Sequence, residues 1–140
     1  NCRFGDPETQ VVLPLLETDL VDIIEAVWEE KLDTLDIKWS DKSCACVVMA
    51  SGGYPQSYPT GIEISGLDKG GQCSADAYVY HAGTKLDGDR FLTAGGRVLG
   101  VTATADTLKG ALDKAYAAVD TIKFENAHFR KDIGRRALEG

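Results

Sequence analysis

The sequence lacks an excess of positive charge. Its 140 residues carry 15 Lys and Arg against 22 Asp and Glu, which leaves a formal net charge of -7. Nucleic acids and anionic membranes select proteins with clustered positive charge, so an acidic chain argues against both as partners. Any anion that it binds must be held by a local site. The sequence also contains no apolar run near the roughly 20 residues that a membrane-spanning helix needs, so we expect a soluble protein.

Cysteine pairs with the two-residue gap of a zinc or redox motif are missing as well. The four cysteines are Cys2, Cys44, Cys46 and Cys73. Cys44 and Cys46 fall inside the apolar run 44–50, where thiols behave as small hydrophobic groups. We interpret this pair as buried thiols, consistent with a reducing cytoplasm, rather than as metal ligands or a disulfide.

The chain has no basic and then apolar opening of the kind that secretory and transit segments carry. It begins at Asn1 rather than Met. Its length suits one ordinary hydrophobic core and is too short for two or three full domains. We therefore expect an excised or processed piece, with one compact domain and a helical arm.

Helical patterns fill the first part of the chain. Asp6 followed by Pro7 predicts a helix start, and Pro14 should kink or shorten that helix. A second helix is predicted to start at Thr18 and to end near Lys31 or Leu32. Its apolar residues recur at the spacing of one buried face. They are Leu20, Ile23, Ile24, Val27 and Trp28.

Strand patterns fill the middle of the chain, separated by glycine-rich turns. The strand candidates are 43–50, the pair Ile62 and Ile64, 77–83 and 97–103. A small antiparallel sheet or open barrel is the simplest assembly. A helix predicted over 106–122, capped by Asp106 or Thr107, should cover one side of it. The tail 129–138 is predicted to form a last helical turn or two.

Residues 1–8 (NCRFGDPE) form the first cluster that suggests chemistry. It places an amide oxygen, a guanidinium and two carboxylates around a glycine. Such groups can coordinate a hard cation, hold an anionic substrate and receive an amine. A helix N-cap among solvated charges is the alternative, and spacing alone leaves both open.

Residues 93–97 (TAGGR) form the second cluster. Successive glycines let backbone N–H groups converge on an anion, and arginine adds a planar fork that suits phosphate. An ordinary β-hairpin turn is the alternative. Lys85 could reach a phosphate bound at this cluster, or it could be an exposed lysine of a hairpin. His81 has the pattern of a hydrogen-bonded structural histidine.

Five strings together resemble the carboxy-terminal part of the phosphoribosylamine–glycine ligase family. They are NCRFGDPETQ (1–10), SGGYP (51–55), HAGT (81–84), TAGGRVLGVTA (93–103) and RKDIG (130–134). They occur in family order at family-like spacing. The resemblance implies an ATP-grasp enzyme of de novo purine biosynthesis, in which ATP converts glycine to an acyl phosphate that the amine of 5-phosphoribosylamine attacks. It also implies Mg²⁺ or Mn²⁺ and ATP in the complete enzyme, with neither held tightly by this chain.

The resemblance also assigns roles to residues. Asn1 resembles an asparagine that gives its side-chain oxygen to the catalytic magnesium. Arg3 would face the glycine carboxylate or the acyl phosphate, and Asp6 would orient the attacking amine. The predicted phosphate-binding loop and its helpers are Gly95, Gly96 and Arg97, with Thr93 and Lys85.

The expected fold class is α+β. Residues 1–39 would be the carboxy-terminal helical end of an ATP-grasp domain, and 40–140 a small antiparallel β-sheet or barrel-like domain covered by a helix. We expect a cytoplasmic chain that is inactive alone and self-associates through Leu20, Ile24 and Trp28. Two alternatives stay open: a noncatalytic phosphate- or nucleotide-binding module, and a piece of another purine-pathway ATP-grasp ligase.

Overall fold

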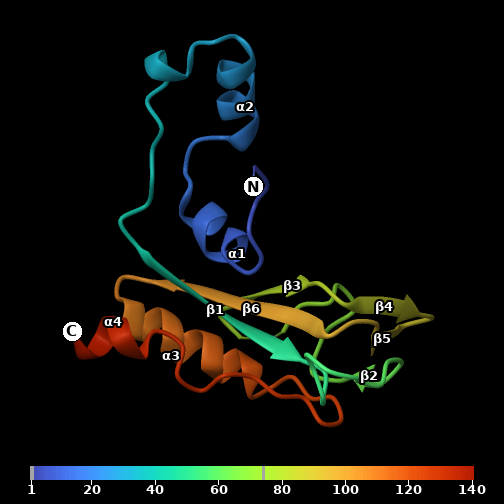
Figure 1. Ribbon diagram of the computed structural model, residues 1–140. Helices are drawn as coiled ribbons and strands as arrows, with labels where there is room; N and C mark the ends of the chain where they lie inside the picture. Colours follow the sequence, from blue (N-terminus) through green and yellow to red (C-terminus); the bar gives the residue numbers. More distant parts are fainter. Residues whose placement is uncertain (1, 74) are drawn as a thin grey trace.

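The computed structural model describes residues 2–73 and 75–140. It has two visible parts (Figure 1): an arm of short helices, residues 2–40, stands on a β-domain made of the remaining chain. A bridge between Leu16 and Trp39 closes the base of the arm. None of the helices in the described residues is long and apolar enough to cross a membrane.

The first sheet of the β-domain has three antiparallel strands in the order β1-β6-β3. They are β1 (Ser43–Ala50), β6 (Arg97–Ala105) and β3 (Tyr78–His81). The sheet is covered on both sides, since α3 and α1 both contact β1 and β6 from opposite faces (Figure 1). Strands buried on two faces read as continuous apolar runs, so β1 and β6 were predictable from sequence. The predictions over 43–50 and 97–103 are confirmed.

The second sheet is smaller and also antiparallel, in the order β2-β5-β4. It contains β2 (Glu63–Ile64), β5 (Arg90–Thr93) and β4 (Thr84–Asp87). The sequence analysis missed β4 and β5. They form a hairpin that turns at Gly88, whose φ of 61° is in the left-handed region. Most of its residues are exposed and polar, so it lacks the apolar pattern that identifies a buried strand.

Helix α3 (Leu108–Val119) covers the first sheet with a row of small residues. Thr107 caps the helix by accepting a hydrogen bond from the Gly110 N–H at 3.1 Å. Its buried residues are Ala111, Leu112, Ala115, Ala118 and Val119. The predicted covering helix is therefore confirmed, although it is shorter than 106–122. The tail contributes only α4 (Arg135–Glu139).

The first helix of the arm differs from the prediction. α1 spans only Thr9–Val12 and continues as a 3₁₀ turn, Leu13–Leu15, that contains Pro14. Pro14 thus shortens the helix as predicted. Asp6, however, is not its N-cap: Glu8 occupies that position without a side-chain cap bond. The Asp6 carboxylate is unavailable for capping because Gln10 and Arg97 contact it.

The second helix, α2 (Leu20–Trp28), also starts and ends differently from the prediction. Asp19 caps it by accepting from the Val21 N–H at 2.8 Å, whereas the Thr18 hydroxyl accepts from the Lys38 N–H at 2.7 Å. The helix ends at Trp28 because Glu30 takes a left-handed φ of 56°. A further 3₁₀ turn follows at Leu32–Thr34.

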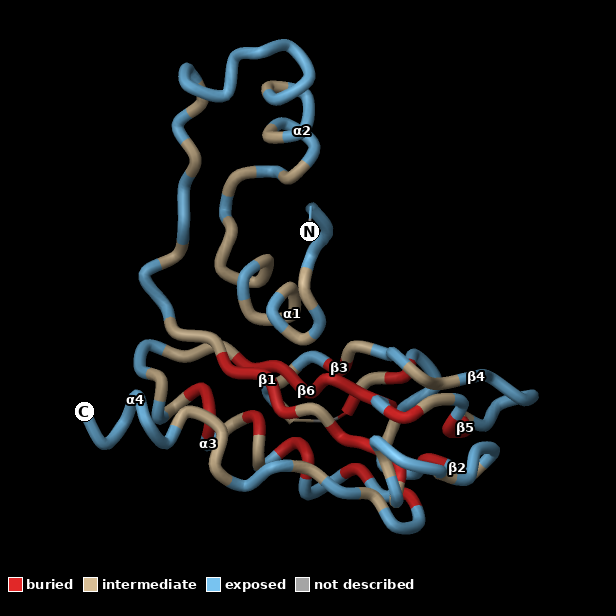
Figure 2. Tube along the Cα trace, viewed as in Figure 1, coloured by how far each residue is buried: buried red, intermediate tan, exposed pale blue. Residues whose placement is uncertain are grey.

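Burial separates the two parts of the molecule. The fully buried residues lie in the β-domain, whereas the arm is exposed or half-buried (Figure 2). On α2, Ile24 is 57% exposed and Trp28 is 88% exposed. The apolar face of α2, whose spacing is that of a buried face, therefore lies open in this chain. Self-association through it stays a prediction.

Candidate functional site

The arm and the β-domain meet at an ion pair between the two predicted clusters. Arg97, the first residue of β6, places Nη2 3.2 Å from Oδ2 of Asp6. Its Nη1 donates to the Asp6 backbone carbonyl at 3.1 Å, across 91 residues of sequence. Both side chains remain more than two-fifths exposed, at 44% and 43%. The fold thus brings Asp6 and Arg97 together where solvent reaches both.

Gln10 holds the other oxygen of the Asp6 carboxylate. Its Nε2 donates to Oδ1 of Asp6 at 2.8 Å, one helical turn away in sequence. The two oxygens of Asp6 are therefore contacted from two elements, α1 and β6. Gln10 Oε1 is buried and has no hydrogen-bond partner among residues 2–73 and 75–140.

A glycine in β6 lets α1 lie close to the sheet at this point. A Cβ atom added at Gly100 would lie 3.3 Å from Cys46 Sγ and 3.8 Å from Gln10 Cγ. A Cβ atom at this position would crowd Cys46 and would only touch Gln10 at an ordinary van der Waals distance. Beside this contact lies a cleft of about 280 Å³, lined by Gly5, Thr9, Gln10, Leu13, Tyr80 and His81.

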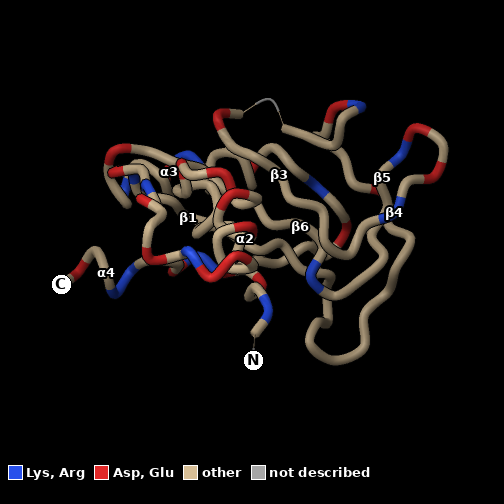
Figure 3. The backbone as a smooth tube through the Cα atoms, turned by 90° about the horizontal axis from the view of Figure 1, so that it is seen from above, with Lys and Arg blue, Asp and Glu red and all other residues tan. Residues whose placement is uncertain are grey.

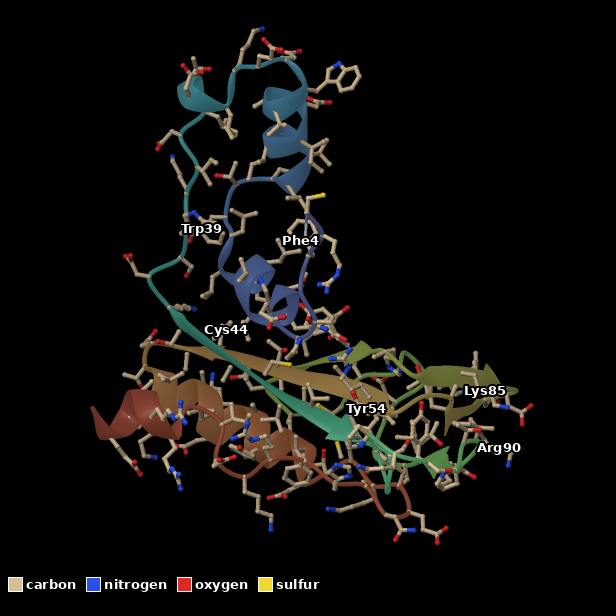
Figure 4. The ribbon with its side chains drawn as sticks, in the orientation of Figure 1. Phe4, Trp39, Cys44, Tyr54, Lys85 and Arg90 are labelled. Atoms are coloured by element: carbon tan, nitrogen blue, oxygen red, sulfur yellow. The ribbon has the colours of Figure 1, made fainter. Side chains whose placement is uncertain are left out.

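The thiols of β1 lie below α1, and Figure 4 shows Cys44 near the start of β1 under the arm. Burial raises the pKa of Cys44 to about 11, with a smaller contribution from Cys46. Burial also raises the pKa of Cys46, and the nearby negative charge of Asp6 adds to the effect. All four cysteines are free thiols. The prediction of buried thiols is confirmed for Cys46, whereas Cys44 is only half-buried.

The Gly95–Gly96 loop next to Arg97 is fixed by Ser51. The Ser51 N–H donates to the Gly96 carbonyl at 2.8 Å, and its hydroxyl donates to the Gly95 carbonyl at 2.8 Å. In the described part of the chain, the N–H groups of Gly95 and Gly96 donate to no backbone carbonyl. Gly95 is half-buried and Gly96 is buried beside the Arg97 backbone.

Close packing requires glycine at both positions. A Cβ atom at Gly96 would lie 2.1 Å from Cδ2 of Tyr54, whose ring lies near the end of β1 (Figure 4). At Gly95 it would lie 3.0 Å from the Cα atom of Gly83. Tyr54 therefore packs against the glycine loop.

The two predicted helpers of this loop differ in accessibility. Thr93 is fully buried, and its hydroxyl accepts a hydrogen bond from the Ile62 N–H at 3.1 Å. Its side chain therefore supports the fold instead of facing a ligand, which corrects its expected place beside a phosphate. Lys85 is exposed on β4 and makes no ion pair with any described residue.

The remaining predicted residues lie at the N-terminus. Asn1, the predicted magnesium ligand, falls outside the described residues. Arg3 is exposed, and its Nη1 donates to the Phe4 carbonyl at 3.1 Å. Within the described residues, no three or more His, Cys, Asp or Glu side chains gather as a metal site would require.

His81 has a structural role. Its Nδ1 lies 2.9 Å from the Thr84 hydroxyl, and its Nε2 lies 2.8 Å from the Gly71 carbonyl oxygen. A carbonyl only accepts, so Nε2 carries the proton and Nδ1 accepts from the hydroxyl. Both ring nitrogens are occupied, which leaves neither for general base chemistry.

The sequence analysis missed Gln10 and Ser51 as parts of the site. A signal for Gln10 was present, since a glutamine four residues after an aspartate can meet it across one helical turn. No comparable signal existed for Ser51, which meets the loop 44 residues further along the chain.

Basic and acidic residues alternate around the molecule without one broad basic face in the described residues (Figure 3).

Comparisons with known proteins add independent findings. Residues 44–136 match the family model described as "Phosphoribosylglycinamide synthetase, C domain". The chain is 49% identical over 133 residues to the phosphoribosylamine–glycine ligase of Caldanaerobacter subterraneus, covering 95% of this chain and 31% of that protein. It is 50% identical over 139 residues to the bifunctional purine biosynthetic protein purD of Dictyostelium discoideum, covering 99% of this chain and 17% of that protein.

A solved structure has the same fold. The crystal structure of phosphoribosylamine–glycine ligase from Thermotoga maritima superposes with a TM-score of 0.72 at 28% identity, and the match covers 94% of this chain and 32% of that one. The chain therefore spans about a third of the length of these ligases, and a smaller share of the bifunctional protein.

Proposed function

Because this chain belongs to the phosphoribosylglycinamide synthetase family, whose C domain it carries over residues 44–136, we propose that it is part of a ligase that joins glycine to 5-phosphoribosylamine with ATP, in purine biosynthesis. The contact between Arg97 and Asp6 carries this proposal. It joins a carboxylate, which suits an amine, to a guanidinium, which suits a phosphate. The substrate 5-phosphoribosylamine carries both an amine and a phosphate.

The reaction requires activation of glycine, because the carbon of a carboxylate is a poor electrophile and carries no good leaving group. Transfer of the γ-phosphoryl group of ATP to a glycine carboxylate oxygen would give glycyl phosphate and ADP. The amine nitrogen of phosphoribosylamine would then attack the acyl carbon, lose a proton and expel inorganic phosphate. Such a sequence needs charge neutralisation and positioning more than covalent help from the protein.

Asp6 and Arg97 are suited to position the amine donor. The Asp6 carboxylate would accept a hydrogen bond from the amine and orient it toward the acyl carbon. Arg97 donates one N–H to the Asp6 backbone carbonyl and pairs through Nη2 with the Asp6 carboxylate, and the other N–H donors of its guanidinium would be available to the 5′-phosphate. The half-buried Gly95 of the predicted loop would add its amide to the same phosphate, and the buried Gly96 would hold the loop in place.

We assign Arg3 and Lys85 to negatively charged groups of the substrates. Arg3, three residues before Asp6, would face the glycine carboxylate or the acyl phosphate. Lys85 is exposed on the hairpin next to the glycine loop and would assist with the phosphate. We assign Thr93 to support of the loop, because its hydroxyl is engaged with Ile62.

Magnesium and ATP would bind mainly outside this chain. Among the described residues no three His, Cys, Asp or Glu side chains gather, so most ligands of Mg²⁺ or Mn²⁺ would come from other parts of the ligase. Asn1 would add one oxygen ligand to a site completed by other parts of the ligase.

The arm would belong to a neighbouring domain. Its apolar side chains are exposed here, and residues 1–39 would complete the carboxy-terminal end of an ATP-grasp domain, with 40–140 as the separate β-rich domain. The open face of α2 supports this division, because an amphipathic helix gains stability by burying its apolar face.

A chimeric ligase tests the proposal. This chain would replace the matching segment of the Caldanaerobacter ligase, to which it is 49% identical. We expect the chimera to form the amide product from glycine, phosphoribosylamine and ATP, whereas bicarbonate or formate in place of glycine gives none. A folded chimera without glycine-dependent ATP turnover would contradict the proposal.

A further inference from the structure

The position of Asp6 depends on two contacts of different quality. The contact with Arg97 is at 3.2 Å, between side chains that are 44% and 43% exposed. Exposed ion pairs hold their partners weakly, because solvent screens them and both side chains keep rotational freedom. Arg97 reaches only one carboxylate oxygen, Oδ2. Such a contact restricts rotation of the carboxylate about its Cβ–Cγ bond only weakly.

The contact with Gln10 supplies the missing constraint. Its hydrogen bond to Oδ1 is shorter, at 2.8 Å, and a hydrogen bond to a carboxylate is stronger than one between neutral groups. Gln10 is itself held by α1 and by its packing beside Gly100. With both oxygens bound from separate elements, the carboxylate has one defined plane.

The buried oxygen of Gln10 indicates a role beyond packing. Oε1 has no partner among the described residues, and a buried acceptor without a donor costs about 1–3 kcal/mol. An apolar residue of the same length would avoid this cost at the same position. A natural structure that keeps such a group calls for an explanation, and the contact with Asp6 is the benefit that Nε2 provides.

We propose that Gln10 is a positioning residue for the attacking amine: it fixes the plane of the Asp6 carboxylate, while Arg97 ties that carboxylate to the phosphate end of the same substrate. The inference rests on the proposed function, in which Asp6 receives the amine. Gln10 itself touches no substrate in this account. Its effect should therefore fall on kcat and leave phosphate recognition intact.

Two substitutions in the chimeric ligase test the inference. Gln10→Met keeps the length of the side chain and removes the donor, and Gln10→Glu keeps the shape and replaces the donor with an acceptor. We expect each to lower kcat at least ~10-fold while KM for phosphoribosylamine changes less than ~3-fold, since a misplaced reacting group costs rate more than binding. Gln56→Met, at an exposed glutamine of the 51–62 loop, is the matched control and should leave both constants unchanged.

A purely structural role predicts a different result. It would lower the thermal midpoint of Gln10→Met and leave kcat per folded enzyme unchanged, which would overturn the inference. Equal kcat for the parent and both variants would overturn it as well. In either case the parent chimera is active, so the proposed function stands.

Crystal structures of this chain give a readout that needs no activity. The parent should show one conformer of the Asp6 carboxylate, and Gln10→Met should show two or more, or a rotated one. An unchanged Asp6 in the variant would overturn the inference. An inactive chimera with a rotated Asp6 would support the positioning role while contradicting the proposed reaction.

Discussion

At the scale of single residues, the Asp6–Arg97 pair matters for placement more than for stability. Both side chains are well exposed, and such pairs contribute at most about 1 kcal/mol to folding. Their contact nevertheless lies where the arm meets the β-domain. A variant of Asp6 or Arg97 is therefore best tested by its kinetic constants for the substrate, with the free energy of unfolding as the control measurement.

Replacement of Arg97 should separate binding from folding. In the chimeric ligase we expect Arg97→Ala to raise KM for phosphoribosylamine by ~10-fold or more, because a charge-assisted contact to phosphate is worth about 1.5–3 kcal/mol. The unfolding free energy should change by less than about 1 kcal/mol. Arg90→Ala is the matched control, since Arg90 is an exposed strand arginine that pairs with Asp87 and Glu63. An equal rise in KM for both variants would argue against a phosphate role for Arg97.

Gly96 should tolerate no side chain. The Cβ atom of Gly96→Ala would lie 2.1 Å from the Tyr54 ring, and such overpacking typically costs about 1–3 kcal/mol. Urea unfolding of this chain measures the loss. Gly70→Ala is the control, because its Cβ atom meets only Asp68 Oδ1, at 3.3 Å. If Tyr54→Ala fails to reduce the cost of Gly96→Ala, the ring is not the cause.

Cys44 should resist alkylation at ordinary pH. A pKa of about 11 leaves roughly one thiol in a thousand ionised at pH 8, and the thiolate is the reactive form. Because the pKa is raised, reactivity should increase as the pH rises toward 11. Mass spectrometry after iodoacetamide treatment at pH 8 should find label on the exposed Cys2 and none on Cys44. Rapid labelling of Cys44 in folded protein would contradict its burial under α1.

At the scale of elements, the pattern of apolar residues predicted those strands and helices in which apolar residues are continuous or regularly spaced. Strands β1 and β6 and helix α3 carry continuous or periodic apolar residues, so their type and order were predictable. The β4–β5 hairpin was missed because cross-strand pairing, not an apolar pattern, forms it. Asp6 was wrongly predicted as a cap, because its carboxylate pairs with Arg97, a residue far along the chain, and accepts from Gln10.

The same limit applies to the candidate site. Residue type and spacing pointed to both clusters but left ordinary structural alternatives open, and only the family resemblance assigned them roles. Their contact depends on how α1 lies on the sheet beside Gly100, which no local pattern encodes. The burial of Thr93 is a further example, since its hydroxyl is bound by a residue 31 positions away.

The α2 helix should cause this chain to associate. Trp28 and Ile24 are largely exposed on one apolar face, and open apolar surface tends to find a partner. Sedimentation should show the parent chain forming dimers or larger species as concentration rises. A variant with Ile24→Ser and Trp28→Ser should stay monomeric and retain its unfolding free energy within about 0.5 kcal/mol. A parent chain that is monomeric at every concentration would contradict this expectation.

At the scale of the whole molecule, the chain holds one side of a proposed active site. It spans about a third of the ligases that it resembles, and its described residues form no metal site. The β-domain would present the amine donor, and the rest of the ligase would supply ATP and the metal. We therefore expect this chain alone to hydrolyse no ATP when glycine and phosphoribosylamine are added. Turnover by the isolated chain would contradict this division of roles.

The central claim is that Asp6 and Arg97 act on one substrate as a unit. A double-mutant cycle of Asp6→Asn and Arg97→Ala in the chimeric ligase, read as kcat/KM for phosphoribosylamine, tests it most directly. We predict that the double variant loses less than the sum of the single losses, with a coupling of at least about 1 kcal/mol, as expected for groups in contact. Losses that add within about 0.3 kcal/mol would mean that the two residues work independently, which would contradict the account.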